Sequence, residues 1–324
     1  MMDWTDRHCR FFYRQLSQHA LLYTEMLTAD AVLHGDRKRL LGFSEAEHSV
    51  ALQLGGSKPE RLAEAARIGA DAGYDEINLN VGCPSDRVQS GRFGACLMAE
   101  PELVSACVAA MQAAVDIPVT VKCRIGIDDQ NGEEDFARFI DVVACAGCRV
   151  FIVHARKAWL KGLSPKENRD IPPLDYDRVY RLKAARPDLN IVINGGIGDH
   201  DAVTAHLNRV DGVMLGRAVY HTPYLLAEVD QRYFSKAGIP RSREAVVEAM
   251  LDYAQEHIDG GGRLQDVTRH MLGLFHDQPG ARAFRRHVTE NARDGKIEVL
   301  RQAIELMHES KNNSFSRTAA VRNI

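Results

Sequence analysis

The sequence predicts a (β/α)₈ barrel followed by a small helical domain, on three observations. Strand-like and helix-like segments alternate from the N-terminus to about residue 237. The strand-like segments are almost continuously apolar, as in parallel sheets that are covered on both faces. From Ser242 onward the segments are helical only, which indicates an appended bundle. We therefore predict a barrel domain at 1–237, a helical domain at 238–310 and a disordered tail at 311–324.

The barrel region contains seven strand-like segments. They cover residues 21–25, 49–54, 76–81, 119–123, 149–154, 190–194 and 212–215. Helical segments are expected at 11–18, 58–72, 101–114, 133–146, 175–185 and 200–208. Alanines at helical spacing mark the segment at 58–72, and Pro101 is typical of a first helical position. Seven strands are one fewer than a closed barrel of this class contains.

The helical region begins with an apolar stripe formed by Ala245, Val246, Ala249 and Met250. The glycines at 260–262 end that first helix. Three more helical segments are expected at 264–275, 280–292 and 297–307. Together they predict a small bundle.

Composition excludes several classes of protein. The chain has 324 residues, 45% apolar and 26% charged, as in an ordinary globular protein. No apolar run is long enough to span a membrane, and the N-terminus has no apolar signal core. Seven irregularly spaced cysteines argue against a disulfide framework, so we expect reduced thiols and a cytoplasmic protein. Cys145 and Cys148 have metal-ligand spacing but no second pair of ligands, so we expect no metal site.

The stretch from Glu76 to Met98 is the most informative part of the chain. It begins as a strand in which apolar residues alternate with Asn78 and Asn80, and the strand stops at Gly82-Cys83-Pro84. A glycine-rich loop follows and carries Cys96. A strand that ends in asparagine and opens into such a loop is typical of an active site. An ordinary βα loop that only needs glycines is the alternative.

Polar or glycine residues recur where the predicted strands end. In barrel enzymes the chemistry lies at these C-terminal strand ends. In this chain the polar or glycine residues at the predicted strand ends are Gln53, Asn80, Lys122, His154, Asn194 and Gly216-Arg217. Gly195-Gly196 and Gly216-Arg217 follow the last two strands, where barrels often bind phosphate through backbone N–H groups and a helix N-terminus. Capping or buried hydrogen bonding would explain any one of these residues alone.

Several motifs resemble those of the tRNA-dihydrouridine synthases, flavoenzymes that reduce uridine in tRNA. The central one is N-L-N-V-G-C-P-S followed by G-A-C-L-M. Others are M-D-W-T-D-R-H-C-R, L-Y-T-E-M, V-K-C-R-I-G, V-H-A-R-K, N-R-D-I-P-P-L, N-G-G-I and D-G-V-M-L-G-R-A-V-Y. The resemblance covers nearly the whole chain. N-R-D-I-P-P-L and P-G-A-R-A-F-R-R-H resemble the A-type bacterial branch, which acts on positions 20 and 20a of the D-loop.

The resemblance implies roles for the strand-end residues. Cys96 would donate a proton to C5 of uracil, and Asn80 would touch the base. The residues implied to hold FMN are Gln53, Lys122, His154, Asn194, Gly195, Gly196, Gly216 and Arg217. Hydride would pass from NADPH to the flavin and then to C6 of uracil. A thiol of ordinary pKa is mostly protonated at pH 7, so Cys96 can act as an acid.

Two basic segments are the candidates for contacting tRNA. The net charge is −3, so any RNA-binding surface must be a local patch. By resemblance, the loop after residue 154 meets the tRNA through Arg156, Lys157 and Arg169. The spacing of Arg282, Arg285 and Arg286 predicts a basic helix face that grips phosphates. A solvated loop and a solvated helix face are the alternatives.

Two other functions and one structural question stay open from the sequence. The chain could be an FMN-dependent reductase of free pyrimidines, or a catalytically silent tRNA-binding paralogue. We expect a monomer that needs no membrane and no stable protein partner. The family places a strand just before M-D-W-T, and we expect the natural start of this protein to lie upstream of Met1.

Overall fold

The computed structural model describes residues 1–85, 88–89, 91–130, 132–293, 295–307 and 309. These residues form two compact units. The first consists of Met1–Asp3 and Leu21–Gly216, and the second of Trp4–Ala20 and the described residues from Arg217 onward. The structural division therefore lies after Gly216, whereas the functional division expected from the sequence lies after residue 237. The expected tail at 311–324 lies outside the described residues.

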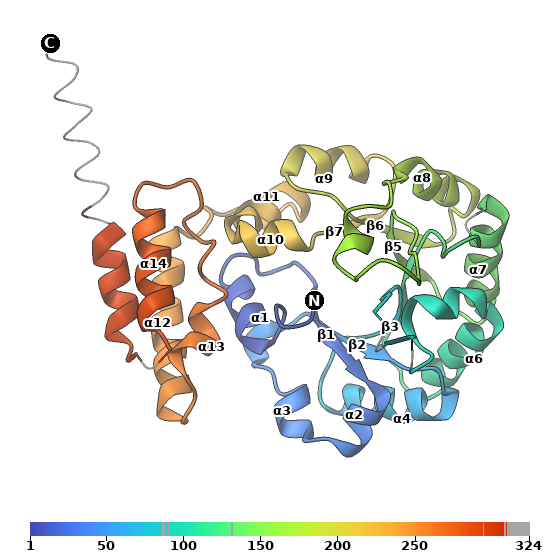
Figure 1. Ribbon diagram of the computed structural model, residues 1–324, viewed down its shortest axis with the longest axis horizontal. Helices are drawn as coiled ribbons and strands as arrows, with labels where there is room; N and C mark the ends of the chain where they lie inside the picture. The colour runs from blue at the N-terminus through green and yellow to red at the C-terminus, as the bar shows by residue number, and fades with distance from the viewer. Residues whose placement is uncertain (86–87, 90, 131, 294, 308, 310–324) are drawn as a thin grey trace, which may run out of the picture. The chain divides into compact units, whose positions relative to one another are not determined.

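The first unit is built on a curled parallel sheet of seven strands in the order β1 to β7. All seven strands expected from the sequence are confirmed, with small changes at their ends. The strands are β1 (Leu22–Thr28), β2 (Val50–Gly55), β3 (Glu76–Val81), β4 (Val119–Arg124), β5 (Val150–His154), β6 (Asn190–Asn194) and β7 (Gly212–Met214). Figure 1 shows the strands at the centre of this unit, with helices outside them. Within the described residues, β1 pairs only with β2, and β7 only with β6.

Burial explains why these segments form central strands. Every residue of β2 is buried, and Ile77 and Leu79 of β3 are fully inaccessible to solvent. Strands covered on both faces need apolar residues at successive positions, which is the pattern that the sequence shows. The prediction of an α/β fold with a parallel sheet is therefore confirmed. The described part of the chain supplies seven strands, and the ladder between its two outer strands is not closed there.

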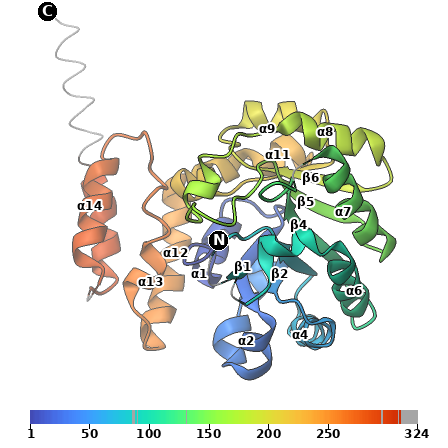
Figure 2. The same cartoon turned by 45° about the vertical axis from the view of Figure 1, so that its right-hand side comes forward.

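Helices of the first unit cover the outside of the sheet, as Figure 2 shows from a second direction. They are α2 (Ala29–His34), α3 (Arg37–Leu41), α4 (Pro59–Asp71), α6 (Pro101–Gln112), α7 (Glu133–Cys145), α8 (Tyr176–Ala185) and α9 (His200–Leu207). The sequence pattern did not predict α2 and α3, because five or six residues are too few to show a helical period. Side-chain caps define their starts instead: Thr28 accepts from the N–H of Ala31, and Asp36 from that of Arg39.

The second unit is helical. It contains α1 (Arg7–Arg14), α10 (Arg217–His221), α11 (Val229–Tyr233), α12 (Arg243–Asp259), α13 (Leu264–Thr268), α14 (Ala281–Asn291) and a helix at 298–307. The expected helix at 11–18 begins earlier, because Asp6 caps α1 by accepting from the N–H of Cys9. No described helix is both long and apolar enough to cross a membrane.

The prediction of one helix from 264 to 275 was wrong beyond Thr268. The chain there tightens into turns in which Met271 donates to Thr268 and Leu274 to Met271, each three residues back. These turns bury Met271, Leu274 and Phe275 almost completely. A Cβ atom on Gly273 would lie 2.3 Å from the carbonyl oxygen of His221, so only glycine fits this approach. Packing therefore overrides the helical pattern.

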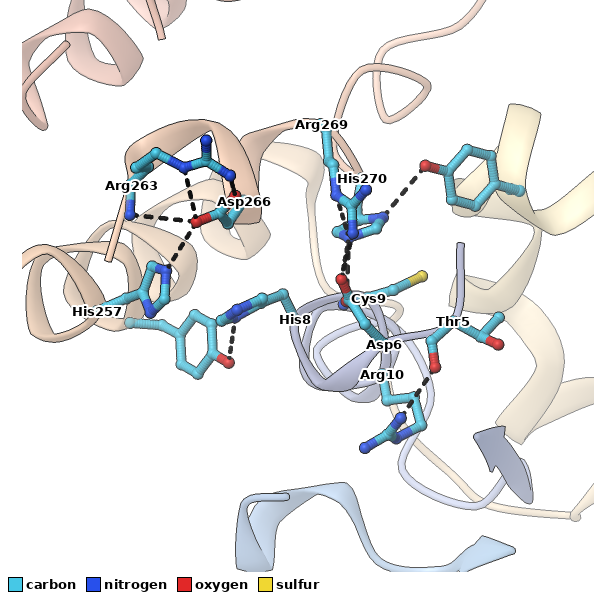
Figure 3. A network of polar contacts seen from close by, with 12 residues as sticks. Thr5, Asp6, His8, Cys9, Arg10, His257, Arg263, Asp266, Arg269 and His270 are labelled. Atoms are coloured by element: carbon cyan, nitrogen blue, oxygen red, sulfur yellow. Dashed lines mark hydrogen bonds and ion pairs between the residues drawn. The ribbon is translucent and has the colours of Figure 1, made fainter. Parts of the chain in front are cut away.

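Asp6 ties the N-terminal segment to the C-terminal helices inside the second unit, as Figure 3 shows. Its carboxylate accepts from the N–H of Cys9 at 3.0 Å, from Nε2 of His270 at 3.0 Å and from the guanidinium of Arg269. Nearby, Nδ1 of His8 lies 2.8 Å from the hydroxyl of Tyr253. Burial acts to raise the pKa of Asp6, but its bonds to His270, Cys9 and Arg269 outweigh burial and hold that pKa well below its usual range.

This network makes the stability of the second unit depend on pH. A carboxyl whose pKa is lowered by folding stabilises the protein above its unfolded pKa of about 4, and that stabilisation is lost as the pH falls below it. We expect Asp6→Asn, which keeps the size and the capping ability, to lower the free energy of unfolding by about 1–3 kcal/mol at pH 7. The difference from wild type should shrink as the pH falls from 4 towards 2.

Urea unfolding can follow the second unit alone, because the two tryptophans lie in different units. In a Trp159→Phe background, the fluorescence of Trp4 reports on the second unit. Asp259→Asn is the matched control, since Asp259 is exposed and bonds only Gln255 among the described contacts. An Asp6→Asn difference of the same size at pH 3 and pH 7 would contradict the assignment.

Candidate active site

The residues at the C-terminal strand ends lie next to one another across the sheet. Gln53 pairs with Asn78, Asn80 with Lys122, and His154 with both Arg124 and Asn194 in the strand register. The parallel arrangement puts all these ends at one edge of the sheet. The sequence prediction that the polar strand ends form one constellation is therefore consistent with the sheet, from β2 to β6.

Asn80 shapes the turn that follows β3. Its Oδ1 accepts from the N–H groups of Gly82 and Cys83, at 3.0 and 2.9 Å. Its Nδ2 donates to Oε1 of Gln53 at 2.8 Å. Asn80 is half-buried and Gln53 is buried. The asparagine side chain therefore satisfies two backbone donors where the strand ladder stops.

The loop that carries Cys96 folds back onto the end of β3. The N–H of Ala95 donates to the carbonyl of Cys83 at 2.9 Å, and residues Gly94–Ala99 form a 3₁₀ turn. Gly94 has a φ of +75°, and a Cβ atom there would lie 2.5 Å from the carbonyl oxygen of Cys83. Only glycine allows the two segments to approach so closely.

The Cys96 thiol is suited to hold a proton. It is half-buried, and Sγ donates to the carbonyl of Phe93 at 3.2 Å. Burial, with a smaller effect from the nearby Glu100 carboxylate, raises the pKa of this thiol. A raised pKa keeps the thiol protonated at neutral pH, so Cys96 is available as an acid and is a poor nucleophile there.

Lys122 is the cation of the constellation. Its Nζ donates to Oδ1 of Asn194 at 3.2 Å, and Nδ2 of Asn194 donates to the carbonyl of Met214 at 2.7 Å. Burial first, and then repulsion by Arg124, lowers the pKa of Lys122 to about 8. The ammonium therefore stays mostly protonated at pH 7 and would be held more firmly by a ligand that carries negative charge.

The glycines after β6 form a cradle that side chains would fill. Gly195 and Gly196 have φ values of +112° and +70°. Added Cβ atoms would lie 2.5 Å from the ring of His154 and 2.6 Å from Leu174. The hydroxyl of Tyr176 donates to the carbonyl of Gly195 at 2.7 Å, which fixes the turn. Backbone in this positive-φ conformation can turn its N–H groups toward an anion, as a phosphate site requires.

One part of the expected phosphate site, the helix N-terminus after the two glycines, differs from the prediction. The N-terminus of α9 is capped by Asp199, whose side chain accepts from the N–H of Ala202. This carboxylate occupies the positive helix end, so α9 adds little to the binding of an anion. Gly216 is the last residue of the first unit, and Arg217 is the first residue of α10 in the second.

Arg124 and Asn168 are structural centres of the site that the sequence analysis missed. Arg124 is 3% exposed and donates to the carbonyls of Gly82, Lys157 and Asn168, at 2.8, 3.0 and 3.1 Å. Burial lowers its pKa to about 10, so it stays charged at neutral pH. Asn168 is fully buried, and it exchanges hydrogen bonds with the backbone of Trp159. A charged residue at an apolar strand end was the available signal.

The basic residues of the loop after β5 play different parts. Arg156 donates to the carbonyls of Asp170 and Pro172, so its guanidinium holds the loop together. Nζ of Lys157 lies 3.7 Å from the ring centre of Trp159. Arg169 is exposed at the end of a short 3₁₀ turn. Of the three residues expected to meet tRNA, Arg169 is thus the most accessible.

The arginines of α14 lie opposite its buried face. Ala281, Phe284 and Val288 are buried, whereas Arg282 and Arg286 are exposed. Arg285 is half-exposed beside them. In the described part of the chain, none of these three arginines forms an ion pair. The positive charge of this face is therefore open to a partner.

Comparison with known proteins points to one family. The family model described as "Dihydrouridine synthase (Dus)" matches residues 1–310. The tRNA-dihydrouridine(20/20a) synthase of Shewanella oneidensis is 61% identical over 305 residues, which are 94% of this chain and 91% of that one. The proteins of the same name from Synechocystis and Escherichia coli are 60% and 54% identical. Their matches cover 90% and 96% of this chain, and 87% and 95% of theirs.

Solved structures show likeness of fold alone. A 2-naphthoyl-CoA reductase complex gives a TM-score of 0.51 at 11% identity, covering 69% of this chain and 46% of that one. An old yellow enzyme homologue from Zymomonas mobilis gives 0.50 at 13% identity, covering 75% and 87%.

The glycine under the Cys96 loop offers a direct test of the site geometry. Gly94→Ala and Gly162→Ala both place an alanine at positive φ, at a cost of about 1–2 kcal/mol. Only at position 94 does the new Cβ meet other atoms, since nothing lies within 4 Å at Gly162. We expect Gly94→Ala to change the alkylation rate of Cys96, measured by peptide mass spectrometry, by about 3-fold or more. Gly162→Ala should leave it unchanged. Equal rates in the two variants would contradict the close packing of this loop.

Proposed function

We propose that this chain, which belongs to the dihydrouridine synthase family, reduces uridine to 5,6-dihydrouridine in tRNA. The observation that carries the proposal is the half-buried Cys96 thiol, whose pKa burial raises, in the loop that folds back onto the end of β3. The 54–61% identity to the tRNA-dihydrouridine(20/20a) synthases supports positions 20 and 20a of the D-loop as the targets. The proposal includes a location in the cytoplasm.

The donor set at the strand ends fits FMN, with NADPH as the reductant. Bound FMN would supply a hydride carrier between NADPH and C6 of the uracil ring. Lys122 would place a positive charge beside the electron-rich edge of the cofactor, and Gln53 and His154 would orient its ring. Gly195, Gly196 and Gly216 would cradle the phosphate together with Asn194 and Arg217. The positive φ values of Gly195 and Gly196, which allow backbone N–H groups to turn toward an anion, support this assignment.

Cys96 acts as the general acid in this proposal. Its sulfur gives a proton to C5 of uracil, while Asn80 holds the base. The raised pKa of the thiol means that the proton is present before the reaction at neutral pH. Lys122 keeps its charge below a pH of about 8, and this positive charge would favour negative charge on a bound cofactor. The thiolate left on Cys96 is reprotonated by water between turnovers.

We further propose that the sheet belongs to the (β/α)₈ class. In this assignment residues 1–237 form the catalytic part, and residues 238–310 form the tRNA-binding part. Arg169 and the open arginines of α14 would bind phosphates, because phosphate contacts supply affinity without reading sequence.

The first test compares two cysteines. We expect the wild type, supplied with FMN, NADPH and tRNA, to form dihydrouridine at positions 20 and 20a, measured by mass spectrometry. Cys96→Ala should reduce this rate by about 10²–10⁴-fold, because it removes the general acid. NADPH oxidation without tRNA should persist. Cys83→Ala is the matched control, since Cys83 is half-buried like Cys96 and its thiol bonds only Ser85 among the described contacts.

Three outcomes would contradict the proposal. Equal losses in the Cys96 and Cys83 variants would remove Cys96 from the mechanism. Reduction of free uracil as fast as tRNA would favour a pyrimidine reductase. A folded wild type that binds FMN but modifies no tRNA would favour a silent paralogue.

The second test concerns α14. Replacing Arg282, Arg285 and Arg286 with alanine should weaken tRNA binding and lower the slope of log Kd against log salt by about 2–3. The slope falls because a variant that contacts fewer phosphates releases fewer counterions when it binds tRNA. FMN content and NADPH oxidation should stay unchanged.

The matched control for α14 removes three positive charges from scattered positions of the same unit: Arg7, Lys296 and Arg301 are all exposed. Binding is measured at several salt concentrations. If both triple variants give the same slope, the α14 face is not a specific contact.

A further inference from the structure

An unbroken series of side-chain hydrogen bonds runs along the inside of the sheet beneath Asn80. We call the six residues that form it the Glu76 relay. Its steps are Asn80 Nδ2 to Gln53 Oε1 (2.8 Å), Gln53 Nε2 to Asn78 Oδ1 (2.9 Å), Asn78 Nδ2 to Thr120 Oγ1 (2.8 Å) and Thr120 Oγ1 to Glu76 Oε1 (2.6 Å), with the Tyr23 hydroxyl also donating to Glu76 Oε1 (2.8 Å). The relay links the N-terminal end of β3 to its C-terminal end.

The direction of the relay is fixed by chemistry. The N–H groups of Gly82 and Cys83 can only donate, so the atom of Asn80 that they meet must be Oδ1. Nδ2 of Asn80 then faces Gln53 and must meet its oxygen. Each following amide is set in the same way. The backbone at the top and the carboxylate at the bottom therefore impose one direction on every group between them.

Glu76 ends the relay as its acceptor. It is 8% exposed, and the hydroxyls of Thr120 and Tyr23 both donate to its Oε1. Burial raises the pKa of Glu76, while the bonds from Thr120 and Tyr23 oppose that effect. Asn78 is fully buried and Thr120 is 1% exposed, so neither can exchange its partner for water. If one amide in this series were reversed, its N–H groups would face a neighbouring donor and its oxygen a neighbouring acceptor. Such mismatches are costly when they are buried.

The relay leaves Asn80 with one kind of free group. Both lone pairs of its Oδ1 are used by Gly82 and Cys83, and one N–H is used by Gln53. Among the contacts of the described residues, what remains is a single N–H donor. Asn80 lies at the strand end and is only half-buried.

We propose that the Glu76 relay, together with the N–H groups of Gly82 and Cys83, holds Asn80 as a donor-only contact, with Asn78, Thr120 and Glu76 as positioning residues. A donor-only contact accepts a ring carbonyl oxygen and rejects an amino group. Uracil and cytosine both have a carbonyl at C2, but at C4 uracil has a carbonyl and cytosine an amino group. A donor-only Asn80 that meets C4 therefore favours uridine as the substrate base, and the same relay fixes the orientation of the Gln53 amide. This step rests on the proposed function.

The test removes one hydroxyl from the middle of the relay. In Thr120→Val, Asn78 loses its acceptor, and the amides of Asn78 and Gln53 are held in their direction only from the Asn80 end. We expect kcat/KM for tRNA uridine to fall by about 10-fold or more, since the buried N–H of Asn78 is left without its acceptor and the Gln53 amide that supports Asn80 is held less firmly. The Kd of the apoprotein for FMN should rise by about 3–10-fold through Gln53. NADPH oxidation at saturating FMN should change by less than about 2-fold.

Three matched variants separate positioning from stability. Thr120→Ser restores the hydroxyl and should bring kcat/KM and the FMN Kd back to near wild type. Tyr23→Phe removes only the second donor to Glu76 and should leave both quantities nearly unchanged. Thr268→Val makes the same substitution at a buried threonine of the other unit, whose hydroxyl donates to Leu264. It should also change neither quantity.

The outcomes are distinct. If Thr120→Val lowers only the urea midpoint and matches Thr120→Ser in kcat/KM and FMN affinity, the relay is merely structural and the inference is wrong. If valine prevents folding, Thr120→Cys replaces it, because a thiol is a weak donor and should give intermediate losses. If the wild type reduces no tRNA uridine, the proposed function fails. The FMN affinities then still decide whether the relay orients Gln53.

Discussion

Buried polar groups inside a parallel sheet must find partners within the protein, and this requirement shapes the site more than any other. Glu76, Asn78 and Asn80 occupy alternate positions of β3, so their side chains share one face of the sheet. They are satisfied by residues of the neighbouring strands, among them Gln53 and Thr120. The hydrogen bonds that stabilise the sheet interior thereby also orient the groups at its functional edge.

A second buried group, the guanidinium of Arg124, organises the loops above that edge. It binds the carbonyl that follows β3 and two carbonyls of the loop after β5. A buried charge is costly unless it is fully hydrogen-bonded, so these loops are held in the one arrangement that satisfies it. The loop that carries the basic residues is thus fixed from its inner side, and its accessible charges point outward from a rigid base.

The Asp6 network explains why the first helix of the chain belongs with the last ones. Asp6 caps α1 and accepts from residues that follow α13, about 260 positions away in the sequence. A boundary drawn from the alternation of strands and helices alone places α1 with the sheet. Hydrogen bonds between side chains so far apart in the sequence cannot be predicted from local sequence patterns, because they depend on which surfaces meet after folding.

The sequence by itself determined the seven strands, the main helices around them and the family motifs, since apolar runs, glycines and helix starts act locally. It also predicted Asn80 and Lys122 as site residues, because polar residues at apolar strand ends are a local signal, and the resemblance of G-A-C-L-M to a family motif added Cys96. Only the tertiary structure decided the direction of the amides, the anchoring of Arg156 and the end of α13 at Thr268. Each of these depends on partners from distant segments, and the cost of leaving a buried polar group unpaired selects among them.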